Sequence, residues 1–535
     1  MKEYFTQLFN SNYFFLSLLL FVFSLPLSVA LVSVAAAIVF LAALLEDSWE
    51  AKMKRFKSRR VLLWIPFIFF LYLASTLVSL KADQSFYDVK KTLFYLVIPL
   101  AFCFGKDINR AQKRAILWTF SVGIFIAIGI ALWRWRFMSF EGGNFPIHEI
   151  SLISHIRFSF QLILGLWFLV LLLISNAQIF CFRKEMLIVI LGIVFLGFLV
   201  LQQSLTGLLA FGASCVFFFV YRFRKINMEW KIPLALILLL LVAVPVIYVR
   251  AVVQKFYTIE EVDQHSIDMK TALGNAYTHD FNNKLVENGH YVYLYVCEPE
   301  MRVEWDKRSE CKYDSIGANG YPISATLIRY LTSKGLRKDA EGVKALTAAD
   351  IKNVEGGISN VIFAQKYSLY PRIYQTVWEY YVYSETGYSN NQSFSQRIEF
   401  AKAALTIIQE NLWSGVGTAH WRQAFADAFK KNNAKLDEDH YASAHNQYLN
   451  YAVKFGVPGL LLILFALVYP VIKTKRFEDP LFMLFLVFMF LANFADSNLE
   501  SHMGSSFFFF FYCFFLTGPL DYLSQKSQTE DSKNI

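Results

Sequence analysis

Long apolar stretches alternate with short polar segments along most of the chain, and they predict membrane-spanning helices. A helix needs roughly 20 apolar residues to cross a bilayer. The stretches that fit this length best cover residues 61–80, 92–105, 114–134, 157–175, 186–202, 205–221, 232–250, 447–471, 480–496 and 504–521. A further stretch, Tyr13–Leu45, is too long for one span, so we interpret it as two spans that turn at Pro26. The pattern predicts about twelve transmembrane helices.

The composition agrees with this pattern. Of the 535 residues, 56% are hydrophobic and only 17% are charged, whereas a soluble chain of this length would expose far more charge. We therefore predict an all-α polytopic membrane protein. The first apolar stretch has no small-residue cleavage site followed by a soluble domain, so we expect it to be retained and not removed as a signal peptide.

Lysine and arginine collect in alternate loops, and this bias predicts the orientation. The loops 46–60, 105–114 and 221–231 are strongly basic, and the loops between them are not. Because basic loops stay in the cytoplasm, both termini are predicted to be cytoplasmic. The formal charge of +9 mostly reflects this bias. No basic cluster is interleaved with aromatic residues on a soluble face, so we do not expect nucleic acid as a partner.

One long polar segment interrupts the apolar pattern and defines the domains. We expect an N-terminal transmembrane bundle of about nine helices in residues 1–250 and a loop domain in residues 251–444. Residues 445–521 should hold the C-terminal transmembrane helices, and residues 522–535 a cytoplasmic tail. The predicted orientation places the loop domain outside the cytoplasm.

The loop domain should be mostly helical with a small β-hairpin. Alternating residues on both sides of Glu298–Glu300 predict the hairpin. Residues 324–336 and 347–355 predict helices, and the second should begin with a capping box between Thr347 and Asp350. Two cysteines, Cys297 and Cys311, either form a disulfide in an oxidising compartment or remain free thiols.

The best helix of the loop domain is predicted over residues 395–413, with Arg397 in its first turn. Its expected apolar stripe consists of Ile398, Ala401, Leu405, Ile408 and Leu412.

Polar groups capable of chemistry gather on the predicted exported face. The membrane interior is nearly free of charge, which argues against a proton-coupled transporter because such proteins carry ionisable residues at mid-membrane depth. A reaction or binding event at the outer surface is therefore favoured. The residues concerned are His155, Arg157, Arg397, His445, Asp496, Glu500 and His502.

His445 and Asn446 stand where the loop domain meets an apolar stretch. An imidazole is the side chain best suited to take a proton from a hydroxyl near neutral pH. Gly456 and Gly459 thin one side of the following helix, which would let a neighbouring helix or a lipid chain approach. The alternative is a polar helix cap followed by a pair of packing glycines.

The spacing His445-Asn446, nine residues, Gly456, two residues, Gly459 resembles the signature of the O-antigen ligase and O-antigen polymerase superfamily. Residues 411–421, "NLWSGVGTAHW", resemble the family's Gly-x-Gly segment, and the segments 202–211 and 498–511 resemble two further family segments. The chain departs from the pattern at Leu205, where the ligases usually carry an arginine. Residues 289–357 look like an insertion without an assigned role.

The resemblance implies a glycosyltransferase of the bacterial inner membrane, with its large loop in the periplasm. Such an enzyme moves a glycan from an undecaprenyl-diphosphate carrier to a hydroxyl of lipid A-core or another acceptor, without a metal ion or other cofactor. His445 would be the base, and Arg397 would hold the diphosphate. Substrate would also be bound by Arg157, Asn446, His155 and Glu500, with Arg157 replacing the cation missing at Leu205. Membrane lipids would be further partners.

Four functions fit these features. The first three are a ligase that moves a finished polysaccharide onto lipid A-core, a polymerase that joins repeat units on the carrier, and an oligosaccharyltransferase that glycosylates Ser or Thr of exported proteins. They share donor, topology and base, so the residues do not separate them. The fourth, a transporter of the lipid-linked glycan, is disfavoured because it needs neither a large exported loop nor a base.

Overall fold

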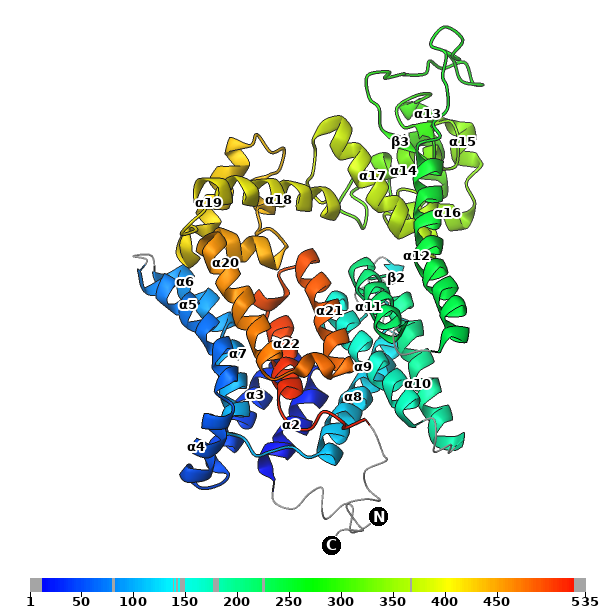
Figure 1. Ribbon diagram of the computed structural model, residues 1–535. Coiled ribbons are helices and arrows are strands. Elements are labelled where there is room, and N and C mark those ends of the chain that lie inside the picture. Colours follow the sequence, from blue (N-terminus) through cyan, green and yellow to red (C-terminus); the bar gives the residue numbers. More distant parts are fainter. Residues whose placement is uncertain are drawn as a thin grey trace. The chain divides into compact units, whose positions relative to one another are not determined.

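The computed structural model describes residues 12–78, 82–137, 139–140, 143–144, 150–176, 182–223, 227–365 and 368–523 (Figure 1). The predicted cytoplasmic tail, apart from Tyr522 and Leu523, lies outside the described residues, as does part of the loop between Phe137 and His155. The chain divides into two compact units. One comprises residues 1–138, 146–238 and 397–535, and the other residues 139–145 and 239–396.

Most of the first unit consists of apolar helices that coincide with the predicted spans. Two helices, α2 (Tyr13–Ser24) and α3 (Val29–Leu45), flank the predicted turn at Pro26. They are followed by α4 (Trp49–Ser58), α5 (Trp64–Val78), α6 (Ala82–Lys91), α7 (Phe94–Phe104), α8 (Arg110–Phe137), α9 (His155–Asn176), α10 (Phe182–Leu201) and α11 (Leu205–Phe223). The last part of the chain supplies α18 (Ser393–Glu410), α19 (Gly417–Lys431), α20 (Gln447–Lys473), α21 (Pro480–Ala495) and α22 (His502–Leu516).

Seven helices in the described part of the chain are long and apolar enough to cross a membrane, or eight if the bent pair α3 and α4 forms one span. They include α12 (Met228–Phe256), which runs from the first unit into the second. The chain is therefore a multi-pass membrane protein of mostly helical fold. The predicted spans over α2, α21 and α22 are shorter helices of 12, 16 and 15 residues, so the number twelve stays a prediction.

The centre of the first unit is built from phenylalanine. All five residues of the run Phe507–Phe511 in α22 are at most 4% exposed. Phe510 stacks on Phe21 of α2 with ring centroids 4.6 Å apart, and Phe485 of α21 packs against Phe508 at 5.6 Å. The phenylalanines of the closing helix therefore form the interior of the bundle.

The second unit contains short helices around two cores, one that includes Met301, Trp305 and Tyr330 and one that includes Phe256 and Tyr374. Its elements are β3 (Val286–Glu287), β4 (His290–Tyr291), α13 (Glu298–Arg308), α14 (Ile323–Ser333), α15 (Ala340–Lys344), α16 (Ala348–Glu355) and α17 (Tyr370–Thr386). A further pair of two-residue strands, β1 (Ser139–Phe140) and β2 (Gly143–Asn144), is antiparallel. The predicted helices at 324–336 and 347–355 are confirmed, and so is the capping box between Thr347 and Asp350.

The hairpin prediction was wrong in position. Glu298–Glu300 begins the helix α13, because proline is favoured in the first turn of a helix and both glutamates lie at the positive end of its dipole. The observed hairpin joins β3 and β4 through Asn288 and Gly289, which both have positive φ. Cys297 and Cys311 are both free thiols.

The predicted helix over residues 395–413 is present as α18, but of its predicted apolar stripe only Ile408 belongs to the buried core. Leu405 and Leu412 are 50% and 44% exposed. Residues Phe400, Ala403, Ala404, Ile407 and Ile408 face the core shared with α19 and α20. The prediction followed Leu405 and missed the face that carries the small alanines, which allow close helix packing.

Candidate functional site

His445 lies in the short connection that precedes α20, and its backbone is strained. Its φ of +46° is in the left-handed region, which non-glycine residues rarely adopt and which often marks functional sites. The neighbouring Ala444 N–H donates to the side-chain oxygen of Asn450 over 3.1 Å, which fixes the connection to the first turns of α20. The imidazole stacks on Phe400 of α18 with centroids 5.6 Å apart. The backbone beside His445 is therefore fixed by Asn450, and its ring is packed against Phe400.

Asp496, directly after the last residue of α21, orients this imidazole. Its Oδ1 lies 3.2 Å from Nδ1 of His445, and its Oδ2 lies 3.3 Å from Nη2 of Arg157. The Arg157 Nε donates to the Ser501 hydroxyl over 2.9 Å. Arg157, Asp496 and His445 thus form one row of polar groups. The row is built from α9, the end of α21, the start of α22 and the connection before α20.

The electrostatics of this row keep Asp496 ionised. Burial alone would raise the pKa of its carboxyl, but the hydrogen bond to His445 and the Arg157 guanidinium hold that pKa below its ordinary value. A carboxylate can only accept, so Nδ1 of a neutral His445 carries the proton and Nε2 carries the lone pair. The side chain of His445 is 41% exposed. The arrangement can therefore accept a proton at Nε2 and stabilise the resulting imidazolium.

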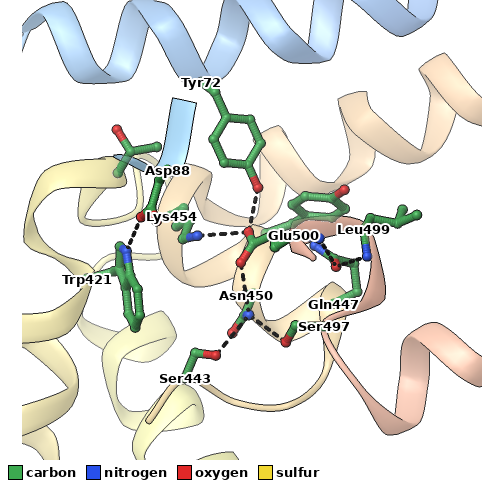
Figure 2. Close-up of polar contacts among 12 residues, drawn as sticks. Tyr72, Asp88, Trp421, Ser443, Gln447, Asn450, Lys454, Ser497, Leu499 and Glu500 are labelled. Carbon is green, nitrogen blue, oxygen red and sulfur yellow. Dashed lines mark hydrogen bonds and ion pairs between the residues drawn. The ribbon is translucent and has the colours of Figure 1, made fainter. Parts of the chain in front are cut away.

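Glu500 belongs to a second, adjoining network, drawn in Figure 2. Its Oε1 accepts from Nζ of Lys454 over 2.8 Å and also from the Tyr72 hydroxyl. Its Oε2 accepts from the side-chain nitrogen of Asn450 over 3.3 Å. The same nitrogen also donates to the Ser497 hydroxyl over 2.8 Å. The same Asn450 binds Ala444 next to His445, so the two networks are joined through it.

The remaining predicted site residues lie as follows. Asn446 caps α20, because its side-chain oxygen accepts from the N–H groups of Tyr448 and Leu449 at 3.0 and 3.1 Å. His155 is the first residue of α9 and lies two positions before Arg157, a spacing that puts the two side chains on different faces of a helix. The structure therefore brings Arg157, His445 and Glu500 into joined networks, while Asn446 stands at the helix start and His155 on another face.

Arg397 is on α18, the same helix whose Phe400 packs against His445. Because α18 begins at Ser393, Arg397 is in its second turn and not in the first turn expected from the sequence. It lies three residues before Phe400, the residue that stacks on His445, so both side chains share one face of α18. The side chain is half-buried and has no ion-pair partner among the described residues.

Gly456 acts differently from the prediction. Gly456 has φ +68° and breaks α20, and an added Cβ would meet the Trp413 carbonyl oxygen at 2.5 Å. Gly415, also with positive φ, would place a Cβ 2.5 Å from the Gly456 nitrogen. Two backbone hydrogen bonds of 2.8 Å, Val416 N–H to Val453 and Val457 N–H to Leu412, flank this crossing. The close neighbour of Gly456 is therefore the turn around Gly415, and not the helix or lipid chain expected.

The part of the chain that carries these features matches a known family. Residues 354–464 match the family model described as O-antigen ligase, and this range contains Arg397, the turn around Gly415, His445 and Gly456. Over this segment the chain is similar to the O-antigen ligase family. A search of curated proteins gives no match.

Leu205, where the resemblance led us to expect an arginine, is the first residue of α11. Arg157, the predicted substitute, pairs with Asp496. Its contact with a donor phosphate stays a prediction.

Sequence reasoning missed Lys454 and Asn450. The membrane interior was judged nearly free of charge, yet Lys454 lies inside the apolar stretch 447–471 with its side chain only 3% exposed. An ionisable residue within an apolar span is itself a signal of function, and Lys454 carried that signal.

Proposed function

We propose that this protein is a glycosyltransferase that moves a glycan from an undecaprenyl-diphosphate carrier to a hydroxyl of lipid A-core at the outer face of the bacterial inner membrane. The match of residues 354–464 to the O-antigen ligase family model supports a lipid-linked glycan donor and an acceptor. The single observation that carries the proposal is the hydrogen-bonded row Arg157, Asp496 and His445, which leaves one imidazole nitrogen for proton transfer.

In the proposed step, the acceptor hydroxyl gives its proton to Nε2 of His445 while its oxygen attacks the anomeric carbon of the glycan. A bond forms between that oxygen and the carbon, and the bond from the carbon to the carrier phosphate breaks. The carrier diphosphate leaves with the bonding electron pair. Asp496 stabilises the imidazolium, as a buried carboxylate does beside a catalytic histidine.

Arg397 is proposed to hold the diphosphate. A guanidinium binds phosphate oxygens through two parallel hydrogen bonds and stabilises the charge on a leaving group. Its position on the face of α18 that carries Phe400 places it on the His445 side of this helix. The charge of the diphosphate is then met by arginine, so the proposal needs no metal ion.

The other site predictions remain part of this proposal. Arg157 and Glu500 are proposed to contact substrate from the joined networks, and Asn446 and His155 from the starts of α20 and α9. The residues 251–444 are proposed to form the periplasmic loop domain of the enzyme.

A deletion strain tests the reaction when surface polysaccharide, glycoproteins and carrier-linked glycan are measured together. Loss of the surface polysaccharide with long chains left on the carrier is expected for the ligase. A surface that keeps a single repeat unit would instead indicate a polymerase, and loss of protein glycans alone would indicate a protein O-oligosaccharyltransferase. An unchanged carrier-linked pool with glycan held on the cytoplasmic side would indicate a transporter.

Complementation of that strain tests the residues. His445→Ala and Arg397→Ala are expected to restore no transfer although the protein reaches the membrane. His440→Ala, in the 3₁₀ turn Glu438–His440 before the same connection, is the matched control and should restore transfer. Full activity of His445→Ala would eliminate the base assignment.

A further inference from the structure

A groove of about 340 Å³ runs between α20 and α21, with α22 at its base. Neither His445, Asp496 nor Arg397 lines it, so it is separate from the row described above. Its walls are aliphatic and aromatic, and no charged residue is among the lining residues that the structure describes. A ligand in this groove would therefore be uncharged and mostly apolar, because a buried charge without a partner costs free energy.

One end of the groove is polar. Gln447, in the first turn of α20, and Asn493, in the last turn of α21, both line it. The Tyr448 hydroxyl donates to the Phe490 carbonyl over 3.0 Å, so the start of α20 lies beside the end of α21. The two amide side chains therefore belong to the same end of the groove, whereas the other end, at Phe477, is apolar.

Each of these two side chains has a buried polar atom without a partner. Gln447 is fully buried, and its Oε1 accepts from the N–H groups of Leu499 and Glu500 at 2.9 and 3.2 Å (Figure 2). Its Nε2 has no hydrogen-bond partner among the described residues, and neither has Oδ1 of Asn493, which is 5% exposed. The hydroxyls of the three lining tyrosines, in contrast, are all bonded within the protein. Unpaired buried polar atoms are rare in native proteins because they cost free energy, so this pair points to a ligand.

The two unpaired atoms require a ligand group that both accepts and donates. Nε2 of Gln447 is a donor, and Oδ1 of Asn493 is an acceptor. A carboxamide or a hydroxyl supplies both an acceptor and a donor, whereas a ketone supplies only an acceptor. A carboxylate supplies only acceptors and would also bring a charge into the apolar groove.

The long side of the groove is suited to a hydrocarbon chain. Val468 and Ile472 of α20 and Phe490 of α21 line the groove and are each more than half exposed. Because α20 is one of the helices long and apolar enough to cross a membrane, these side chains would contact lipid. A chain can therefore enter the groove from the bilayer.

We propose that this groove binds a neutral single-chain lipid whose carboxamide or hydroxyl is held by Gln447 and Asn493 and whose chain lies along Leu467 and Val471. The site requires neither a diphosphate nor a glycan, so it goes beyond the transfer reaction proposed above. A bound lipid would also join the start of α20 to the end of α21.

Photoaffinity labelling of the purified full-length protein in nanodiscs tests the proposal. The probe is decanamide with a diazirine in its chain, and mass spectrometry of the cross-linked peptides is expected to find the label on α20 and α21. Unlabelled decanamide or decanol should prevent labelling at a concentration at least about tenfold lower than methyl nonyl ketone, which has no donor for Asn493. Decanoate should also compete at least about tenfold less well than decanamide, because its charge has no partner in the groove.

Asn493→Leu tests the polar end. It removes the acceptor at similar size, so it should reduce labelling at least about tenfold and abolish the preference for amide over ketone. Because the change removes an unpaired buried polar atom, the Tm should not fall, which separates loss of binding from loss of folding. Phe494→Leu is the matched control, since Phe494 is the next residue of α21 but does not line the groove, and it should be labelled as the wild type is.

Leu486→Trp tests the apolar part, because it fills the groove from α21 and should reduce labelling at least about tenfold. Val487→Trp, one position further along and not in the lining, is its control and should be labelled normally. Three results would overturn the site: competition by the ketone or by decanoate equal to that of decanamide, a label outside α20 and α21, or undiminished labelling of Leu486→Trp. Labelling that decanamide cannot saturate would also overturn it, since water alone would then satisfy Gln447 and Asn493.

Discussion

Nδ1 of His445 lies 3.2 Å from Oδ1 of Asp496, although 51 positions separate the two residues in sequence. One belongs to the connection before α20 and the other follows α21, so the contact exists only when both helices are in place. Arg157, from α9, holds the other oxygen of the same carboxylate. The tautomer of His445 is therefore set by three separate parts of the fold.

Replacement of Asp496 by asparagine is expected to lower transfer about 10²- to 10⁴-fold, which is the usual contribution of general acid–base catalysis. The asparagine keeps the shape but no longer fixes the tautomer of His445 or stabilises its charged form. The rate of glycan transfer by purified protein measures this. Asp439→Asn, at an exposed aspartate of the same connection, is the control and should leave the rate unchanged. Equal rates for the two variants would contradict the role of Asp496.

Asp496 should also give the protein an acid-sensitive part of its stability. Its pKa in the folded state is below the ordinary value of about 3.9, so the folded state binds fewer protons than the unfolded state near that pH. The stabilisation is present above about pH 4 and is lost as the pH falls through the folded pKa. The difference in Tm between wild type and Asp496→Asn should be largest near neutral pH and should disappear at acidic pH. A Tm difference that grows as the pH falls would show that Asp496 does not supply this acid-sensitive stability.

Gly456→Ala is expected to destabilise the protein by about 1–3 kcal/mol, the cost of a strained backbone for a residue with a Cβ. That Cβ would in addition meet the Trp413 carbonyl at 2.5 Å. Thermal unfolding in detergent and the amount of membrane-inserted protein both report the effect. Gly212→Ala in α11 is the control, because no atom lies within 4 Å of its added Cβ and alanine favours a helix. If both variants unfold at the same temperature, the crossing at Gly456 does not constrain the fold.

Asp350→Asn should weaken the second unit by about 0.5–2 kcal/mol, the range found for lost helix caps. Burial alone would raise the pKa of this carboxyl, but hydrogen bonds from Lys334, Tyr330 and Thr347 hold it far below the ordinary range. Thermal unfolding followed by tryptophan fluorescence, to which the core residue Trp305 contributes, measures the loss. Glu341→Gln, an exposed acid on α15, should change little.

Local patterns predicted most of the helices because apolar length and capping chemistry act over short distances. The turn at Pro26, the helix α14 and the capping box of α16 depend on residues at most a few positions apart. The hairpin failed because alternation around Glu298 resembles a strand, whereas Pro299 in a first turn favours a helix. The predicted apolar stripe of α18 was mostly wrong because the face that becomes buried depends on the packing of α19 and α20 against it.

The candidate site could be predicted only in part. His445 and Arg157 were singled out from their residue type and predicted position, and Asp496 was noted beside them. That Asp496 contacts both of them depends on how α9, α20 and α21 pack, which spacing along the chain does not encode. Lys454 and Asn450 were missed because they lie within an apolar stretch, which was interpreted only as a packing surface.

The crossing at Gly456 makes the chain between it and His445 a spacer of fixed length. The helical part of this spacer, Gln447–Phe455, advances about 1.5 Å and turns about 100° for each residue. One inserted or deleted residue would therefore swing the imidazole away from Asp496 and Phe400 while the crossing stays in place. The interval between histidine and glycine is a geometric requirement of the fold, whatever side chains fill it.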